Sequence, residues 1–173
     1  MKKKELINIL KECGAIKFGD FILTSGAKSK YYIDIKKAST NPIILKKIIK
    51  EIAKYSYDYD LIAGMELGAV PLIVALSLET NIPYVIIRKE KRDHGTSKQI
   101  EGENVEDKKV LIIEDVTTSG GSVIQCINIL KQNNAILDKI IVIVDRENGA
   151  KEKIEDYKLE LIPLLSISDI LNK

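Results

Sequence analysis

The stretch Val110-Leu111-Ile112-Ile113-Glu114-Asp115-Val116-Thr117-Thr118-Ser119-Gly120-Gly121-Ser122 decides the fold. Its first four residues are all apolar, without the alternation of a strand that has one face in water. Continuous apolar character is typical of a strand in a parallel sheet covered by helices on both faces. Two carboxylates and a turn rich in hydroxyls and glycine follow. The stretch therefore predicts a buried strand that ends in polar side chains at one edge of a sheet.

Three more apolar runs and two helical patterns surround this stretch. The runs are Leu61-Ile62-Ala63, Tyr84-Val85-Ile86-Ile87 and Ile140-Ile141-Val142-Ile143-Val144, and the helical patterns cover residues 70–79 and 120–132. Strands that alternate with helices form βαβ units. We expect an α/β fold with a parallel central sheet flanked by helices.

The two ends of the chain extend this core. Asn41-Pro42 is typical of a helix start, and apolar residues at helical spacing continue to about Tyr55. Residues 159–165 fit a last strand, and Ser166 with Asp169 resembles a capping box for a terminal helix.

Residues 1–40 precede this core. Residues 18–23 and 31–35 favour two short antiparallel strands joined by a turn. We expect one domain over residues 1–173, with a small N-terminal cap over residues 1–40 and an α/β core over residues 41–173.

Composition excludes several classes of protein. The chain has 173 residues, of which 45% are hydrophobic and 30% charged, so it is too apolar for a disordered protein. The net charge of +2 gives no general basic surface for nucleic acid. The longest mostly apolar run without a charge, residues 67–78, is shorter than the ~18 residues of a membrane span. We expect neither nucleic acid nor membrane as a partner.

Cysteine and histidine are scarce. Cys13 and Cys126 lie far apart in helix-like segments, which favours buried, reduced thiols and a cytoplasmic protein. His94 is the only histidine, so it alone would have to serve any catalytic triad, and a histidine-rich metal site is excluded.

The turn after the acids is suited to a phosphate. Free amides at a helix start, the positive end of the helix dipole and nearby hydroxyls bind anions, and glycine permits close approach. The hydroxyls come from Thr117, Thr118, Ser119 and Ser122. The alternative is a turn whose Ser and Thr residues merely cap the helix.

Glu114 and Asp115 have the opposite preference. Adjacent carboxylates repel phosphate, but they accept hydrogen bonds from sugar hydroxyls and stabilise positive charge that develops on a ribose ring. A phosphate at one end and a ribose at the other indicate a phosphoribosyl group.

Residues 110–122 resemble the phosphoribosyl-diphosphate (PRPP) motif of the type I phosphoribosyltransferases, in which a hydrophobic strand, two acids and a Thr/Ser/Gly loop come in this order. The resemblance implies that PRPP is bound by Glu114, Asp115, Val116, Thr117, Thr118, Ser119, Gly120, Gly121 and Ser122.

A cationic loop follows the run at residues 84–87. Arg88-Lys89-Glu90-Lys91-Arg92-Asp93-His94-Gly95-Thr96 places four cations and a histidine within seven residues. These charges suit a diphosphate leaving group, and closure over the substrate would exclude water. The alternative is a solvated run of charges.

This loop resembles the catalytic loop of orotate phosphoribosyltransferases. The resemblance implies that Arg88, Lys89, Arg92 and His94 contact the PRPP diphosphate, and that Lys89, Arg92 and His94 reach a neighbouring subunit's site in a homodimer. The family commonly has Lys where Arg92 stands. Because Arg holds its proton, His94 is the better candidate for proton transfer, although it could also be an ordinary loop histidine. The catalytic candidates are Arg92, His94, Glu114 and Asp115.

Two further segments bear on the base. Asp145-Arg146-Glu147 offers a guanidinium fork suited to a planar carboxylate or a pyrimidine carbonyl, or else forms a surface ion pair. The resemblance implies that Arg146 and Thr118 contact orotate. Residues 23–34 match the family more loosely, with Thr24 and Ile33 departing from its bacterial members, so Tyr31 and Tyr32 carry no assigned contact.

The resemblance covers nearly the whole chain. It implies an orotate phosphoribosyltransferase of pyrimidine biosynthesis that converts orotate and PRPP into orotidine 5′-monophosphate and diphosphate. The implied cofactor is Mg²⁺, carried mainly by the substrate without a direct protein ligand. Two alternatives stay open: a phosphoribosyltransferase that uses a purine base, and a regulator that senses PRPP without catalysis.

Overall fold

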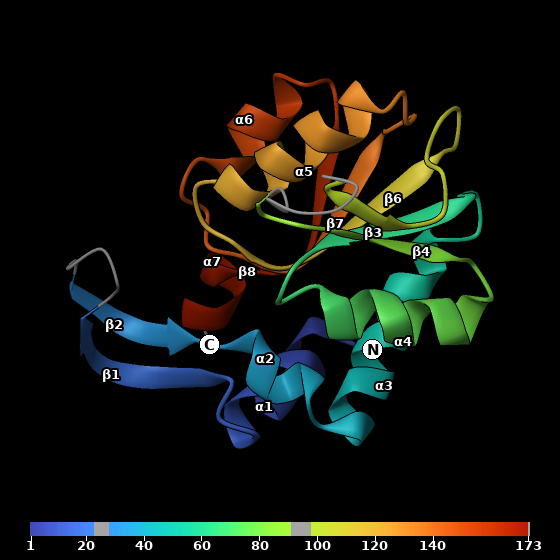
Figure 1. Cartoon of the computed structure of the whole chain (residues 1–173). Coiled ribbons are helices and arrows are strands. Elements are labelled where there is room, and N and C mark those ends of the chain that lie inside the picture. The colour runs from blue at the N-terminus through green and yellow to red at the C-terminus, as the bar shows by residue number, and fades with distance from the viewer. Residues whose placement is uncertain (23–27, 91–97, 173) are drawn as a thin grey trace.

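Strand β6 (Val110–Thr117) lies inside a six-stranded sheet in the computed structural model of the chain (Figure 1). The structure describes residues 1–22, 28–90 and 98–172. The strand order is β5-β4-β3-β6-β7-β8, and every neighbouring pair is parallel except β4 and β5. The other strands are β3 (Leu61–Met65), β4 (Tyr84–Ile87), β5 (Ile100–Gly102), β7 (Lys139–Asp145) and β8 (Glu160–Ser166). The predicted α/β fold is confirmed.

Strand β6 is longer than its apolar run. It continues through the two acids, and its last pairs with β7 are Val116 with Val144 and Thr117 with Asp145. Pairing with β7 holds the polar residues in extended form, so the strand ends in polar side chains as expected. The acids are therefore fixed by the sheet itself.

Helices cover both faces of the sheet, as Figure 1 shows. Helices α5 (Gly121–Gln132) and α6 (Ala150–Glu155) lie on one face. The opposite face carries α1 (Lys3–Glu12), α2 (Ile35–Ser39), α3 (Pro42–Ile52), α4 (Val70–Thr80) and α7 (Ile167–Leu171). Successive β6 residues point to opposite faces, so Leu111 and Ile113 join one hydrophobic core and Val110 and Ile112 the other. Burial of both faces explains the unbroken apolar run.

The predicted helix caps are confirmed. The Asn41 side chain accepts hydrogen bonds from the amides of Ile43 and Ile44, at 3.0 and 3.2 Å. Helix α3 then continues as a 3-10 turn (Ala53–Tyr55), at the expected end. Ser166 and Asp169 form the capping box of α7.

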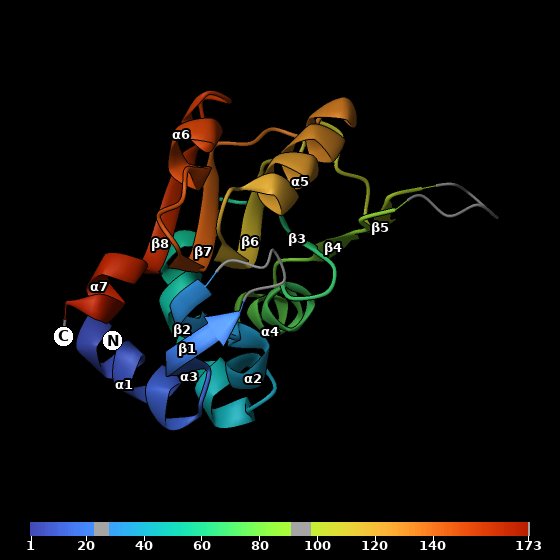
Figure 2. The same cartoon turned by 90° about the vertical axis from the view of Figure 1, so that its left-hand side faces the viewer.

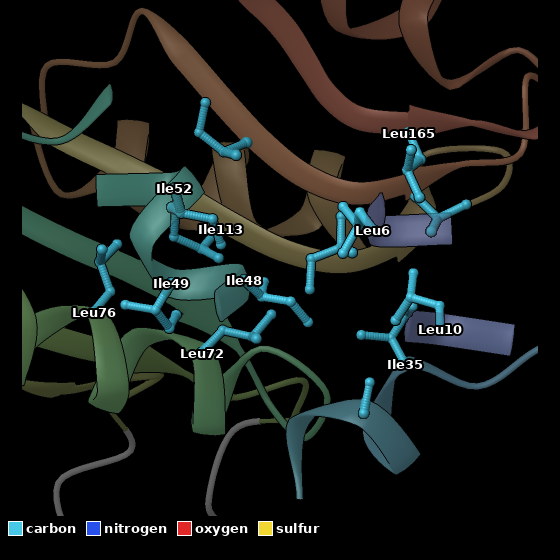
Figure 3. Close-up of a cluster of buried hydrophobic side chains, with 14 of the residues drawn as sticks. Leu6, Leu10, Ile35, Ile48, Ile49, Ile52, Leu72, Leu76, Ile113 and Leu165 are labelled. Carbon is cyan, nitrogen blue, oxygen red and sulfur yellow. The ribbon is translucent and has the colours of Figure 1, made fainter. Parts of the chain in front are cut away.

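Residues 1–40 contain α1, α2 and an antiparallel ribbon of β1 (Ile16–Ile22) and β2 (Lys28–Ile33). Figure 2 shows the ribbon on the side of the sheet where α1 to α4 lie. Leu6, Leu10 and Ile35 are buried in the same cluster as the sheet and α3, as Figure 3 shows. The segment expected to form a cap thus shares its hydrophobic core with the sheet.

Some elements were not predicted from the sequence. Strand β5 lies in a polar segment that was interpreted as loop, and it pairs with β4 through backbone bonds that need no apolar side chain. Helix α6 was also missed. Both cysteines are free, and Cys126 is buried as expected, whereas Cys13 at the end of α1 is only half-buried. Within the described ranges, no helix is long and apolar enough to cross a bilayer.

Candidate active site

The acid pair, Glu114 and Asp115, lies near the carboxyl end of β6. Glu114 is only 6% exposed, and its Oε1 accepts a hydrogen bond of 3.0 Å from the Asp115 amide. Asp115 Oδ1 accepts one of 2.8 Å from the Val116 amide. Burial, and then the neighbouring Asp115, raise the pKa of Glu114 to about 8, although the charge of Lys89 acts to lower it. Burial therefore favours the protonated form of Glu114, which lowers the negative charge of the pair below what its composition implies.

A hollow of about 250 Å³, called here the acid hollow, opens beside this pair. It lies at the carboxyl ends of β3 and β6, where ligands bind in open α/β sheets. Its lining residues are Lys36, Met65, Glu66, Leu67, Gly68, Lys89, Glu114, Asp115, Val116 and Ser122. Cations and acids thus face the same space.

The phosphate cradle, defined as residues 117–122, forms a second hollow of about 210 Å³. Glu114, Val116 and Ser122 line both hollows, so the two adjoin. Helix α5 starts directly after Gly120, its N-cap residue, which has no side chain that could cap the first turn. The first amides of a helix lack partners inside the helix and attract anions. The cradle can therefore hold a phosphate next to the acid pair.

Gly120 is required by the shape of this turn. Its φ of 80° lies in the left-handed region, and a Cβ there would lie 3.3 Å from Ala150 Cα in α6. The Lys153 ammonium donates a 3.0 Å hydrogen bond to the Ser119 carbonyl. Helix α6 thus supports the cradle from outside.

The first two residues of the cationic loop, Arg88 and Lys89, lie in different environments. Lys89 lines the acid hollow of its own chain, where its amide donates to Glu66 Oε1 at 3.0 Å and its carbonyl accepts from Gln125 Nε2 at 2.7 Å. Arg88 instead lies with its Nη1 3.7 Å from Glu101 Oε1 on β5, and it lines neither hollow. Arg92 and His94 lie outside the described residues.

Arg146 follows β7 and lies beside the cradle. Its amide donates to the Thr117 carbonyl at 2.9 Å, next to Thr118, which lines the cradle. Its guanidinium lies 5.2 Å from the centre of the Tyr31 ring. In the described part of the chain, no carboxylate forms an ion pair with it, so the surface ion pair considered from the sequence is not found there.

Several lining residues were missed from the sequence. Glu66 directly follows the buried strand β3, and this position was a usable signal. Lys36 comes from α2, and only the folded chain brings this helix to the acid hollow.

The fold and the paired hollows define a phosphoribosyltransferase. The family described as Phosphoribosyl transferase domain matches residues 35–167. An orotate phosphoribosyltransferase of Methanocaldococcus jannaschii is 51% identical, with 98% of this chain and 97% of that relative covered. One of Pyrococcus abyssi is 54% identical over 97% and 94% of the two chains. The crystal structure of the Aeropyrum pernix orotate phosphoribosyltransferase has a TM-score of 0.87 at 29% identity and covers 96% of each chain.

The chain belongs to the orotate phosphoribosyltransferases, enzymes that act in pyrimidine biosynthesis. The resemblance inferred from the sequence is thereby confirmed, and these relatives favour it over a purine-base enzyme or a non-catalytic regulator.

Proposed function

We propose that PRPP lies across the two hollows, with its 5′-phosphate in the cradle, its ribose over the acid pair and its diphosphate toward Lys89. The observation that carries this proposal is the adjacency of the hollows, which share Glu114, Val116 and Ser122. The uncapped start of α5 suits the phosphate, and the carboxyl oxygens suit the ribose hydroxyls.

Orotate is proposed to bind beside the ribose, between Thr118 and Arg146. The amide of Arg146 donates a hydrogen bond to the carbonyl of Thr117, and Thr117 precedes Thr118 in the chain. The backbone of Arg146 therefore lies close to Thr118. A guanidinium binds a planar carboxylate through two parallel hydrogen bonds. A purine base has no carboxylate and would gain little from Arg146.

In the proposed reaction, a ring nitrogen of orotate gives up its proton and forms the bond to C1 of the ribose while the bond from C1 to diphosphate breaks, and the departing diphosphate can accept the proton. The acid pair supports the positive charge that develops on the ribose. Lys89, together with Arg88, Arg92 and His94 of the cationic loop, is proposed to neutralise the departing diphosphate. The roles of Arg88, Arg92 and His94 rest on the resemblance in sequence.

Mg²⁺ is the proposed cofactor. It favours oxygen ligands and is bound in proteins by one or two carboxylates together with substrate phosphates. The acid hollow has room for a substrate and has the Asp115 carboxylate in its lining, and we propose that the substrate, without a direct protein ligand, coordinates most of the cation. These residues fit a cation that enters with PRPP, and such a cation would offset the charge of the diphosphate. PRPP, orotate and Mg²⁺ are the proposed ligands.

We further propose a homodimer in which Arg92 and His94 act in the neighbouring subunit's site, whereas Lys89, which the resemblance also assigned to that site, is proposed to act in its own. In the single chain, Lys89 lines the hollow of its own subunit.

Mixing two inactive variants tests the shared site and catalysis together. Arg92→Ala and Asp115→Asn should each lose most diphosphate release, and a mixture should recover part of it, because one active site in the mixed dimer is intact. A mixture no more active than its components would contradict the shared site. PRPP binding without diphosphate release by the wild type, at any orotate concentration, would contradict catalysis.

A further inference from the structure

Tyr31 and Arg146 connect the N-terminal ribbon to the base side of the active site. Tyr31 lies on β2, and Arg146 directly follows β7, far from Tyr31 in the sequence. The guanidinium lies 5.2 Å from the centre of the Tyr31 ring, and both side chains are half-buried. A guanidinium within about 6 Å of a ring centre is attracted to its face, more strongly where water is partly excluded.

The ribbon fixes the position of Tyr31. Its side chain packs against the hydrophobic core, on the face of β2 that also carries Ser29 and Ile33, whereas Tyr32 points outward. Ser29 Oγ donates to the Tyr31 carbonyl at 2.7 Å and accepts from the Tyr31 amide at 3.3 Å. The ring is thus held by packing and by its own backbone.

Among the described residues, no carboxylate pairs with the guanidinium of Arg146. The neighbouring acids are engaged elsewhere: Asp145 Oδ1 accepts from the Glu147 amide at 3.0 Å, and Glu147 Oε2 accepts from the Ser168 amide at 2.8 Å. The five N–H donors of a guanidinium lie in its plane, so a ring against its face leaves them free for a carboxylate.

We propose that Tyr31 is a positioning residue for orotate, which holds the Arg146 guanidinium at the angle that binds the substrate's carboxylate. This inference rests on the proposed function, in which Arg146 contacts orotate. If Tyr31 has this role, the N-terminal ribbon contributes to the selection of the base. The sequence had predicted no contact between this segment and the base.

Steady-state kinetics of Tyr31→Leu and Tyr31→Phe test the proposal. Tyr31→Leu removes the ring and should raise KM for orotate about three- to tenfold, with KM for PRPP unchanged. Tyr31→Phe keeps the ring and should restore an orotate KM close to wild type. Tyr157→Leu is the matched control, because it removes a ring 5.3 Å from the Lys131 ammonium on α5, and its orotate KM should not change.

Arg146→Ala distinguishes the proposal that Tyr31 positions Arg146 from the proposal that Arg146 binds orotate. An unchanged orotate KM in Arg146→Ala would contradict the role of Arg146 itself. If Arg146→Ala raises that KM but Tyr31→Leu does not, or if Tyr31→Phe is as poor as Tyr31→Leu, positioning by Tyr31 is wrong. Tyr31→Met, which keeps more of the volume, replaces Tyr31→Leu if the latter fails to fold, with the same expected rise. The double variant of Tyr31→Leu and Arg146→Ala should bind orotate no more weakly than Arg146→Ala alone.

Discussion

Gly68 lies directly against the carboxylate of Asp115. A Cβ at position 68 would lie 2.3 Å from Asp115 Oδ2 and 2.5 Å from its Cγ, well inside van der Waals contact. Asp115 cannot move away freely, because its other oxygen accepts a hydrogen bond from the Val116 amide. The absence of a side chain at position 68 therefore allows the acid pair to face the acid hollow.

Gly68→Ala should weaken PRPP binding at least tenfold, since the new methyl group must displace either Asp115 or the loop that carries Gly68. Titration calorimetry with PRPP and Mg²⁺ measures the effect, and thermal unfolding checks that the fold is retained. Wild-type affinity in a folded Gly68→Ala protein would show that the position of Asp115 is not critical for PRPP.

Lys36→Met should raise KM for PRPP about tenfold, because a charge-assisted hydrogen bond contributes roughly 1.5–3 kcal/mol and Lys36 is the cation that α2 supplies to the acid hollow. Lys37→Met is the matched control. Lys37 is also exposed on the same helix, but its ammonium lies toward Gly14. Equal effects of the two substitutions on KM would refute a specific role for Lys36.

Glu114 should make the ligand-free protein less stable as the pH rises. Its pKa of about 8 in the folded protein lies above its ordinary value of 4.5, so the folded state binds a proton that the unfolded state has released. The stability due to this proton is complete below pH 4.5 and is lost as the pH rises through about 8.

Glu114→Gln keeps the shape of the side chain and cannot ionise. Urea unfolding of both proteins between pH 5 and pH 8.5 should show the wild type losing stability relative to the variant, by at most about 1.4 kcal/mol per pH unit. A difference that is independent of pH would mean that Glu114 ionises at its ordinary pKa.

Asn41→Ala should lower the free energy of unfolding by about 1 kcal/mol, since the side chain caps α3 through two amides. Asn41 lines neither hollow, so kcat/KM for orotate should be unchanged. Urea unfolding checks the first expectation and steady-state kinetics the second. A loss of activity without a loss of stability would contradict both.

The sequence predicts the parts of this molecule that depend on local chemistry. Both faces of β6 are buried, so its apolar run is unbroken, and Asn41 and Ser166 cap helices by bonds to residues two or three positions away. The turn at residues 117–122 was predicted for the same reason, because its residues are contiguous, and phosphate binding there stays a prediction.

Features that depend on distant contacts were not predicted. Strand β5 exists because its backbone bonds to β4, and Lys36 reaches the acid hollow only after α2 packs beside the sheet. The raised pKa of Glu114 depends on burial beneath α5, which two adjacent acids in a sequence do not indicate. Tyr31 meets Arg146 only because the ribbon folds against the core.

The central claim is that the paired hollows and Arg146 select orotate as the acceptor of the phosphoribosyl group. Initial rates with PRPP, Mg²⁺ and either orotate, hypoxanthine or adenine test it most directly. We predict rapid formation of orotidine 5′-monophosphate and diphosphate with orotate, and background rates with both purine bases. Turnover of hypoxanthine or adenine without turnover of orotate would contradict the account.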